Sequence, residues 1–95
     1  MTPELPEIHE ALLDDATLRT LLSDIEQFGT SVSISVRRPT GTTQEEAYRN
    51  PRAVEPILLG TTPAAVQIRY SHDGKAWCDS LRPTPTGVRL IRIES

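Results

Sequence analysis

The chain has few of the residues that usually supply covalent stabilisation or nucleophilic chemistry. Its single cysteine, Cys78, excludes a disulfide within the chain and is typical of a protein kept in the reducing cytoplasm. Its five glycines are scattered, so no glycine-rich phosphate loop is present. No apolar run approaches the length of a membrane-spanning helix, and residues 1–4 do not resemble the start of a secretory signal. We therefore expect a cytoplasmic protein with no membrane partner.

Metal and catalytic sites are not indicated either. His9 and His72 are the only histidines, they are not three or four residues apart, and only one thiol is available. Cys78 and His72 lie on opposite arms of a predicted hairpin, out of contact range for a nucleophile and its base. We predict no metal, no cofactor and no enzymatic activity.

The length and the charge distribution describe a small domain with two unlike parts. With 95 residues and a hydrophobic content of 37%, the chain has room for a single domain over residues 1–95 with a thin core. Residues 1–30 carry a charge balance of −6, whereas residues 31–95 carry +3. This asymmetry is either the ordinary acidic surface of a helix or a means of steering a partner.

Residues 1–29 are predicted to be helical. Apolar residues from Ile8 to Phe28 recur at spacings of three and four, which is typical of one amphipathic helical stripe. The polar run Asp14–Thr17 interrupts this stripe, and aspartate is a good N-cap. We expect a short helix over about 4–13 and a longer helix over about 15–28, with one continuous helix as the alternative.

Four strands are predicted after this helical segment. Residues 31–38 alternate apolar and polar side chains, as a half-buried strand does. Two turn signals divide residues 64–93 into a three-stranded meander with strands over 64–70, 75–81 and 87–93. Sequential strands usually neighbour each other, so strand 31–37 is expected at an edge. The predicted fold is α+β, with one or two N-terminal helices packed on a four-stranded, mainly antiparallel sheet that ends in a β-meander.

Residues 39–63 form a long connection that is predicted to be irregular or partly helical. Threonines at 42 and 43 precede glutamates at 45 and 46 by three residues, a capping-box pattern that predicts a short helical piece ending near Asn50. Residues 54–59 are apolar enough to reach the core. They fit either a helical turn or an edge strand, because Pro56 suits both.

The first hairpin of the meander fixes which side chains share a face. If Asp73 and Gly74 form a two-residue turn, Ile68 lies opposite Asp79. A four-residue loop over residues 71–74 is the alternative, and it changes the partners but not the faces. Asp79 then lies on the apolar face of the sheet, where an unpaired carboxylate is costly. Arg92, on the neighbouring strand, is its predicted partner in a structural ion pair.

The last strand is apolar on both faces. Val88 and Leu90 lie on one face, and Ile91 and Ile93 lie on the other. Either a bulge switches the pattern midway, or both faces are covered. In the second case the cover on the far face is the long connection or a second copy of the chain.

The function that these patterns favour is a non-enzymatic protein-binding or accessory module whose partner is another protein or a second copy of itself in a homodimer. This hypothesis depends on the lack of a catalytic constellation and on the surplus apolar surface of the last strand. The candidate interaction residues are Arg37, Arg69, Arg89, Ile91 and Ile93.

Two alternatives stay open. The first is a nucleic-acid-binding domain that uses the arginine-bearing polar face of the sheet, although the pI of about 5.3 and the lack of aromatic residues on that face oppose it. The second is a small enzyme with a pocket near Asp79.

Overall fold

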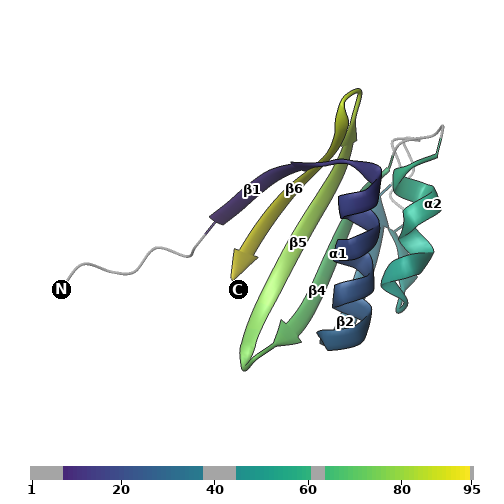
Figure 1. The fold of residues 1–95 in the computed structure, drawn as a ribbon. Helices are drawn as coiled ribbons and strands as arrows, with labels where there is room; N and C mark the ends of the chain where they lie inside the picture. Colours follow the sequence, from purple (N-terminus) through teal and green to yellow (C-terminus); the bar gives the residue numbers. More distant parts are fainter. Residues whose placement is uncertain (1–7, 38–44, 61–63, 95) are drawn as a thin grey trace.

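The computed structural model describes residues 8–37, 45–60 and 64–94, and it shows an α+β fold with one antiparallel sheet and helices on one side (Figure 1). The predicted fold class is confirmed. The strands are β1 (Ile8–Leu13), β2 (Thr30–Arg37), β3 (Glu45–Tyr48), β4 (Ala65–His72), β5 (Lys75–Thr84) and β6 (Gly87–Glu94). The helical segments are α1 (Asp15–Phe28), the 3₁₀ helix η1 (Pro51–Val54) and α2 (Glu55–Leu58).

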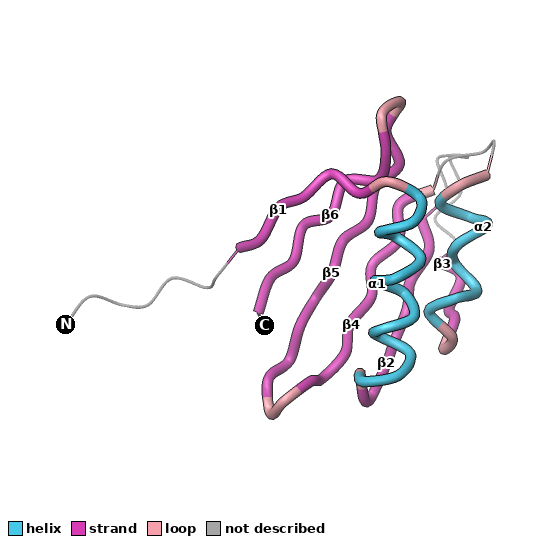
Figure 2. Tube along the Cα trace, in the orientation of Figure 1, coloured by secondary structure: helices cyan, strands magenta, loops and turns pink. Residues whose placement is uncertain are grey.

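The described strands form a six-stranded sheet in the order β1-β6-β5-β4-β2-β3, and each neighbouring pair is antiparallel. The last three strands are neighbours, as the predicted meander requires. The prediction of four strands is corrected, because β1 and β3 extend the sheet at its two edges (Figure 2). For the same reason β2 lies inside the sheet, between β4 and β3, and not at an edge.

Residues 8–13 form strand β1, and the short helix predicted there is wrong. β1 pairs with β6 along its whole length, from Ile8 opposite Ile93 to Leu13 opposite Val88. In this arrangement Leu13 is buried, whereas Leu12 is 58% exposed. The apolar residues of this segment therefore do not share one face, as their helical spacing had predicted. A helix this short is marginal in water, and β6 offers a complete row of backbone partners.

Helix α1 has the predicted bounds, Asp15–Phe28. It begins at Asp14, whose Oδ1 accepts a hydrogen bond from the backbone N–H of Thr17 at 2.7 Å. Hydrogen bonding to the side chain of Thr17, and to its backbone N–H, holds the pKa of the Asp14 carboxyl below its ordinary value. The buried side chains of α1 are Leu18, Leu22 and Ile25.

The described part of the long connection contains one strand and two short helical segments. Residues 45–48 pair with β2 as strand β3, so the helical piece predicted before Asn50 is corrected there. The two threonines of its capping-box pattern lie outside the described residues. Residues 54–59, which fitted either a helix or a strand, are largely helical, and Pro56 lies in the first turn of α2. Val54 and Leu58 join the core on the helical side.

The register of the β4–β5 hairpin is confirmed, because Ile68 lies opposite Asp79. Asp73 and Gly74 form its turn with φ angles of 55° and 77°, the left-handed values that a two-residue hairpin turn favours. β6 continues beside β5 without a register shift, so no bulge switches its pattern.

The core lies between the helical segments and one face of the sheet. Figure 1 shows α1 and α2 on the same side of the strands. Burial of apolar side chains in this single layer is the main stabilising contribution to the fold. Its fully buried larger side chains include Leu18, Leu22, Val54, Ile34, Val36, Val66, Ile68 and Leu81.

Candidate functional site

No described helix covers the face of the sheet opposite α1 and α2 (Figure 1). We call it the open face. Side chains alternate across a strand, so the strand registers assign its members. Its members with described side chains include Glu10, Leu12, Ser33, Ser35, Arg37, Ala65, Gln67, Arg69, Cys78, Ser80, Arg82, Arg89, Ile91 and Ile93.

Arginines from four adjacent strands give the open face its charge. Arg37, Arg69, Arg82 and Arg89 come from β2, β4, β5 and β6, and all four are exposed. Glu10 forms an ion pair with Arg89 at 3.5 Å, in which both side chains are more than half exposed. Within the described ranges, neither Arg69 nor Arg82 has an ion-pair partner. The open face therefore carries a net positive charge.

Two transverse rows of side chains shape a hollow in this face. In the first row Arg37 lies opposite Ala65, and Arg82 lies opposite Arg89. In the second row Ser35, Gln67, Ser80 and Ile91 follow one another across β2, β4, β5 and β6.

The small side chains in both rows leave a hollow of about 340 Å³ between the arginines. We call this feature the arginine hollow. Its lining residues are Ser35, Arg37, Ala65, Val66, Gln67, Ser80, Leu81, Arg82, Arg89 and Ile91.

The β1–β6 side of the open face carries apolar side chains beside the Glu10–Arg89 ion pair. Leu12 is 58% exposed and Ile93 is 36% exposed, and they are two of the three exposed large hydrophobic residues among those described. Ile91, which is half-buried, connects them to the arginine hollow. Apolar and basic side chains thus adjoin on one surface.

On the other face of the sheet, Asp79 and Arg92 meet as a paired carboxylate and guanidinium. Arg92 donates from Nε to Asp79 Oδ1 and from Nη2 to Oδ2, both at 2.8 Å. Tyr70 donates its hydroxyl hydrogen to Asp79 Oδ2 at 3.0 Å. Asp79 is completely buried, whereas the Arg92 side chain keeps 29% of its exposure.

This cluster explains how the core tolerates a carboxylate. Among the described residues, no buried side-chain oxygen or nitrogen lacks a hydrogen-bond partner. The hydrogen bond to Asp79 raises the pKa of Arg92. Burial, together with the Asp79 charge, raises the pKa of the Tyr70 phenol. All three groups are engaged with one another, which suits a structural role and not an acid–base role.

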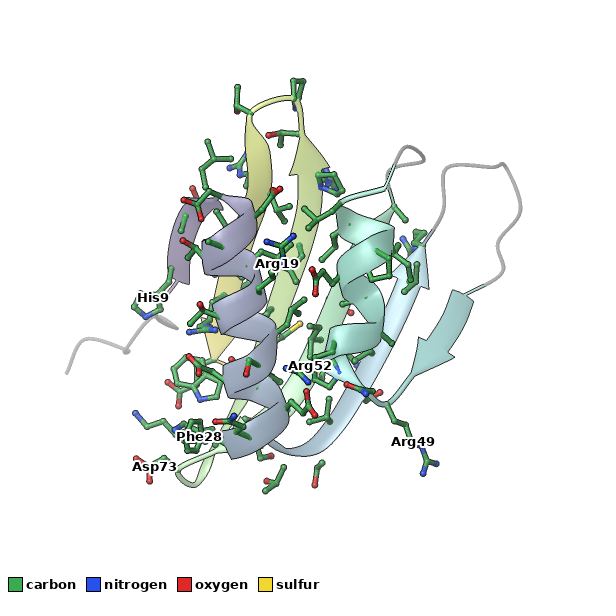
Figure 3. The ribbon with its side chains drawn as sticks, turned by 45° about the vertical axis from the view of Figure 1, so that its right-hand side comes forward. His9, Arg19, Phe28, Arg49, Arg52 and Asp73 are labelled. Carbon is green, nitrogen blue, oxygen red and sulfur yellow. The ribbon has the colours of Figure 1, made fainter. Side chains whose placement is uncertain are left out.

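The helical side of the molecule has its own ion pairs, which join the helical segments. Arg19 on α1 donates from Nε to Glu55 Oε1 at 2.6 Å, and Arg52 Nε lies 3.1 Å from Glu26 Oε2. Figure 3 shows Arg19 and Arg52 between the two helical segments, whereas Arg49 points away from them. These two ion pairs join α1 to η1 and to α2.

The contact between α1 and the β4–β5 turn supplies no site. The His72 ring nitrogen Nδ1 lies 3.2 Å from the carbonyl oxygen of Phe28, which ends α1. Figure 3 shows Phe28 and Asp73 together at this end of the molecule.

Across the described ranges, no group of three or more His, Cys, Asp or Glu side chains could hold a metal ion. No helix in these ranges is long and apolar enough to cross a membrane.

The five predicted interaction residues all belong to the open face. Three of them, Arg37, Arg89 and Ile91, line the arginine hollow, whereas Arg69 and Ile93 lie outside its lining. Sequence reasoning missed Arg82. Its signal is the turn at Pro85 and Thr86, which sets Arg82 opposite Arg89 in the second hairpin.

The chain matches no protein-family model, no curated protein and no solved structure. Its function must therefore be inferred from the geometry of its own surfaces.

Proposed function

We propose that this chain is a non-enzymatic binding module that uses its open face to dock an acidic protein partner. The observation that supports the proposal is the display of four arginines from four adjacent strands beside exposed apolar side chains. Arginine and apolar anchors together are typical of the energetically important parts of protein interfaces.

The charge of the open face sets the expected chemistry of the partner. Arg69 and Arg82 have no ion pair with another described residue, so their guanidinium groups are available to carboxylates of a partner. Guanidinium groups bind carboxylates through paired hydrogen bonds, which give geometric specificity. The apolar side of the face, Leu12 and Ile93, adds surface whose burial favours association.

A nucleic-acid partner is less well supported by the same surface. Proteins that bind single strands on a sheet offer aromatic side chains on which bases stack. Tyr70 and Trp77 lie opposite each other on the helical side of the sheet, and no aromatic side chain is among the described members of the open face. Without base stacking, the arginines of the open face would offer a nucleic acid only electrostatic attraction to its phosphates.

The test is capture from a nuclease-treated lysate of the source organism, using the full chain as bait, followed by calorimetry with the purified captured protein. Arg69→Glu and Arg82→Glu reverse a charge on the open face. Arg49→Glu, a matched reversal outside that face, is the control. We expect either open-face variant to weaken binding of the captured protein at least about tenfold, and the control to leave the affinity within about twofold.

Three results would overturn the proposal. The first is capture that does not depend on Arg69 or Arg82. The second is sedimentation that shows dimers of the purified chain which the open-face variants abolish, since the partner is then a second copy. The third is tight binding of mixed-sequence oligonucleotides at low salt that weakens steeply as salt rises, which is the signature of phosphate contacts.

A further inference from the structure

The arginine hollow combines three guanidinium groups with small polar neighbours. Neighbouring strands lie about 4.8 Å apart, so the backbones of Arg37 on β2 and Arg82 on β5 are about 10 Å apart with Ala65 between their strands. Long arginine side chains can span this distance. Arg37, Arg82 and Arg89 can therefore reach one anion held above the small side chains of the hollow.

The unliganded arrangement places like charges next to each other. Arg82 and Arg89 are directly opposite on adjacent strands, a position in which like charges are destabilising. Glu10 offsets Arg89 only in part, because their 3.5 Å contact is solvent-exposed and such pairs contribute little. A bound anion between the two guanidinium groups would remove this repulsion.

The donor set favours a phosphate group over a carboxylate. One arginine fork already satisfies a carboxylate, which has two oxygens and one charge. A phosphate monoester carries a charge of about −1.5 to −2 and three acceptor oxygens, and it can engage several guanidinium groups at once. Ser35 and Ser80 hydroxyls border the same hollow, and Ile91 gives its wall an apolar part for the carbon chain that carries the phosphate.

We infer that the arginine hollow binds a phosphate monoester, held by Arg37, Arg82 and Arg89. The inference rests on the proposed function in that the hollow belongs to the docking face, and it adds a chemistry that docking alone does not require. The phosphate belongs either to a phosphorylated side chain of the partner or to a small phosphorylated molecule.

The test is a titration of the isotope-labelled full chain with phenyl phosphate, followed by backbone amide NMR at low salt near pH 7.5. We expect saturable shifts at Ala65, Ser80 and their strand neighbours. Arg82→Gln should weaken binding at least about tenfold. Arg69→Gln, which removes the same charge from the same face outside the hollow, should weaken it less than about threefold. Arg82→Gln should also fold normally, because it relieves the repulsion with Arg89.

Benzoate and phenyl sulfate are the ligand controls, and both should bind more weakly than phenyl phosphate. The inference is overturned if phenyl phosphate causes no saturable shift, if Arg69→Gln and Arg82→Gln lose affinity equally, or if benzoate binds as tightly. Tighter binding of a short phosphoserine peptide than of inorganic phosphate supports a phosphorylated protein segment as the source. Equal binding supports a small phosphorylated molecule.

The experiments distinguish failure of the phosphate-binding inference from failure of the docking proposal. Absence of phenyl phosphate binding, combined with loss of the protein partner in Arg69→Glu and Arg82→Glu, rejects the phosphate site alone. Binding of phenyl phosphate without any variant-sensitive protein partner rejects docking alone.

Discussion

At the scale of single residues, Asp79 shows how a charge is accommodated inside a thin core. Its carboxylate is completely buried, and both oxygens are engaged by Arg92 and Tyr70. A buried ion pair adds little net stability compared with apolar residues of the same size, but removing one partner leaves the other uncompensated. The stability of the sheet is therefore sensitive to this position in an asymmetric way.

We expect Asp79→Asn to lower the free energy of unfolding by about 2–4 kcal/mol, a little less than for a fully enclosed pair because Arg92 retains some solvent contact. Urea denaturation followed by circular dichroism measures this change. The matched control replaces all three members of the cluster, Asp79→Leu with Arg92→Met and Tyr70→Phe, so that no buried polar group loses its partner, and it should recover most of the loss. An unchanged denaturation midpoint for Asp79→Asn would contradict the structural role.

The sequence alone indicates that Asp79 needs a partner, whereas it does not single out Arg82. Asp79 stands out because the alternation of its strand places it among apolar side chains, and a buried carboxylate needs a partner nearby. Arg82 is an ordinary exposed residue on its own strand. It becomes part of a site only because it lies opposite Arg89 on the next strand and because the small side chain of Ala65 lines the hollow beside it.

At the scale of elements, α1 illustrates a helix whose beginning is fixed by one side chain. Asp14 accepts a hydrogen bond from Thr17, and it lies directly before the first helical residue. The negative charge also suits the positive end of the helix dipole. Asp14 is thus both a hydrogen-bond acceptor and a titrating group at the same helix end.

This cap gives α1 a pH dependence of definite sign. The folded state lowers the pKa of Asp14 from its ordinary value, so its charged form contributes stability at neutral pH, and the contribution is lost as the pH falls through the folded-state pKa. We expect Asp14→Ala to lower the thermal midpoint near pH 6 and Asp14→Ser, which keeps an acceptor, to retain most of it. Thermal melts between about pH 6 and pH 2 make the comparison. Parallel acid losses in the wild type and in Asp14→Ser would show that the Asp14 charge does not matter.

Local patterns predicted elements well where the chain pairs with its near neighbours. The β4–β5 register follows from the turn at Asp73 and Gly74 alone, because a two-residue turn fixes every pair in the hairpin. α1 likewise follows from its apolar spacing and its cap.

Patterns failed where the pairing partner is remote in the sequence. Residues 8–13 have apolar positions that fit a helix, and residues 45–48 begin with the glutamates of a capping-box pattern that predicts a helix. Both segments are nevertheless strands at the sheet edges. Backbone pairing with β6 and with β2 decides their structure. Tertiary pairing of this kind overrides a weak local preference, and no local signal reports it.

At the scale of the whole molecule, the two sides differ in charge. Asp15, Asp24 and Glu26 lie on α1, whereas the four open-face arginines lie on the opposite side of the sheet. The charge asymmetry of the sequence therefore becomes an asymmetry between the two layers. Such a distribution orients a charged partner during its approach, and the effect weakens as salt screens the field.

The sheet should also be unevenly stable across its width. Among the described strands, β1 has β6 as its only neighbour, and it exposes Ala11 and Leu12. β4 and β5 have strands on both sides and side chains in the core. We expect the hydrogen-bonded amides of β1 to exchange with solvent at least about tenfold faster than those of β5 in native-state hydrogen exchange. Equal protection of the two strands would show that the sheet opens only as a unit.

The pairing of Ile8 with Ile93 also sets an order of events when the chain is made and folds. β1 precedes every other described element in the chain and β6 follows every other one. β1 therefore lacks β6, its one partner among the described strands, until synthesis has passed residue 94. The β4–β5 hairpin and α1 require only local contacts and can form earlier. Joining β1 to β6 instead closes residues 8–93 into one loop, which carries the largest entropic cost among the described strand pairings. An interrupted chain that lacks β6 would therefore expose two unpaired strand edges, those of β1 and β5, and would be prone to aggregate.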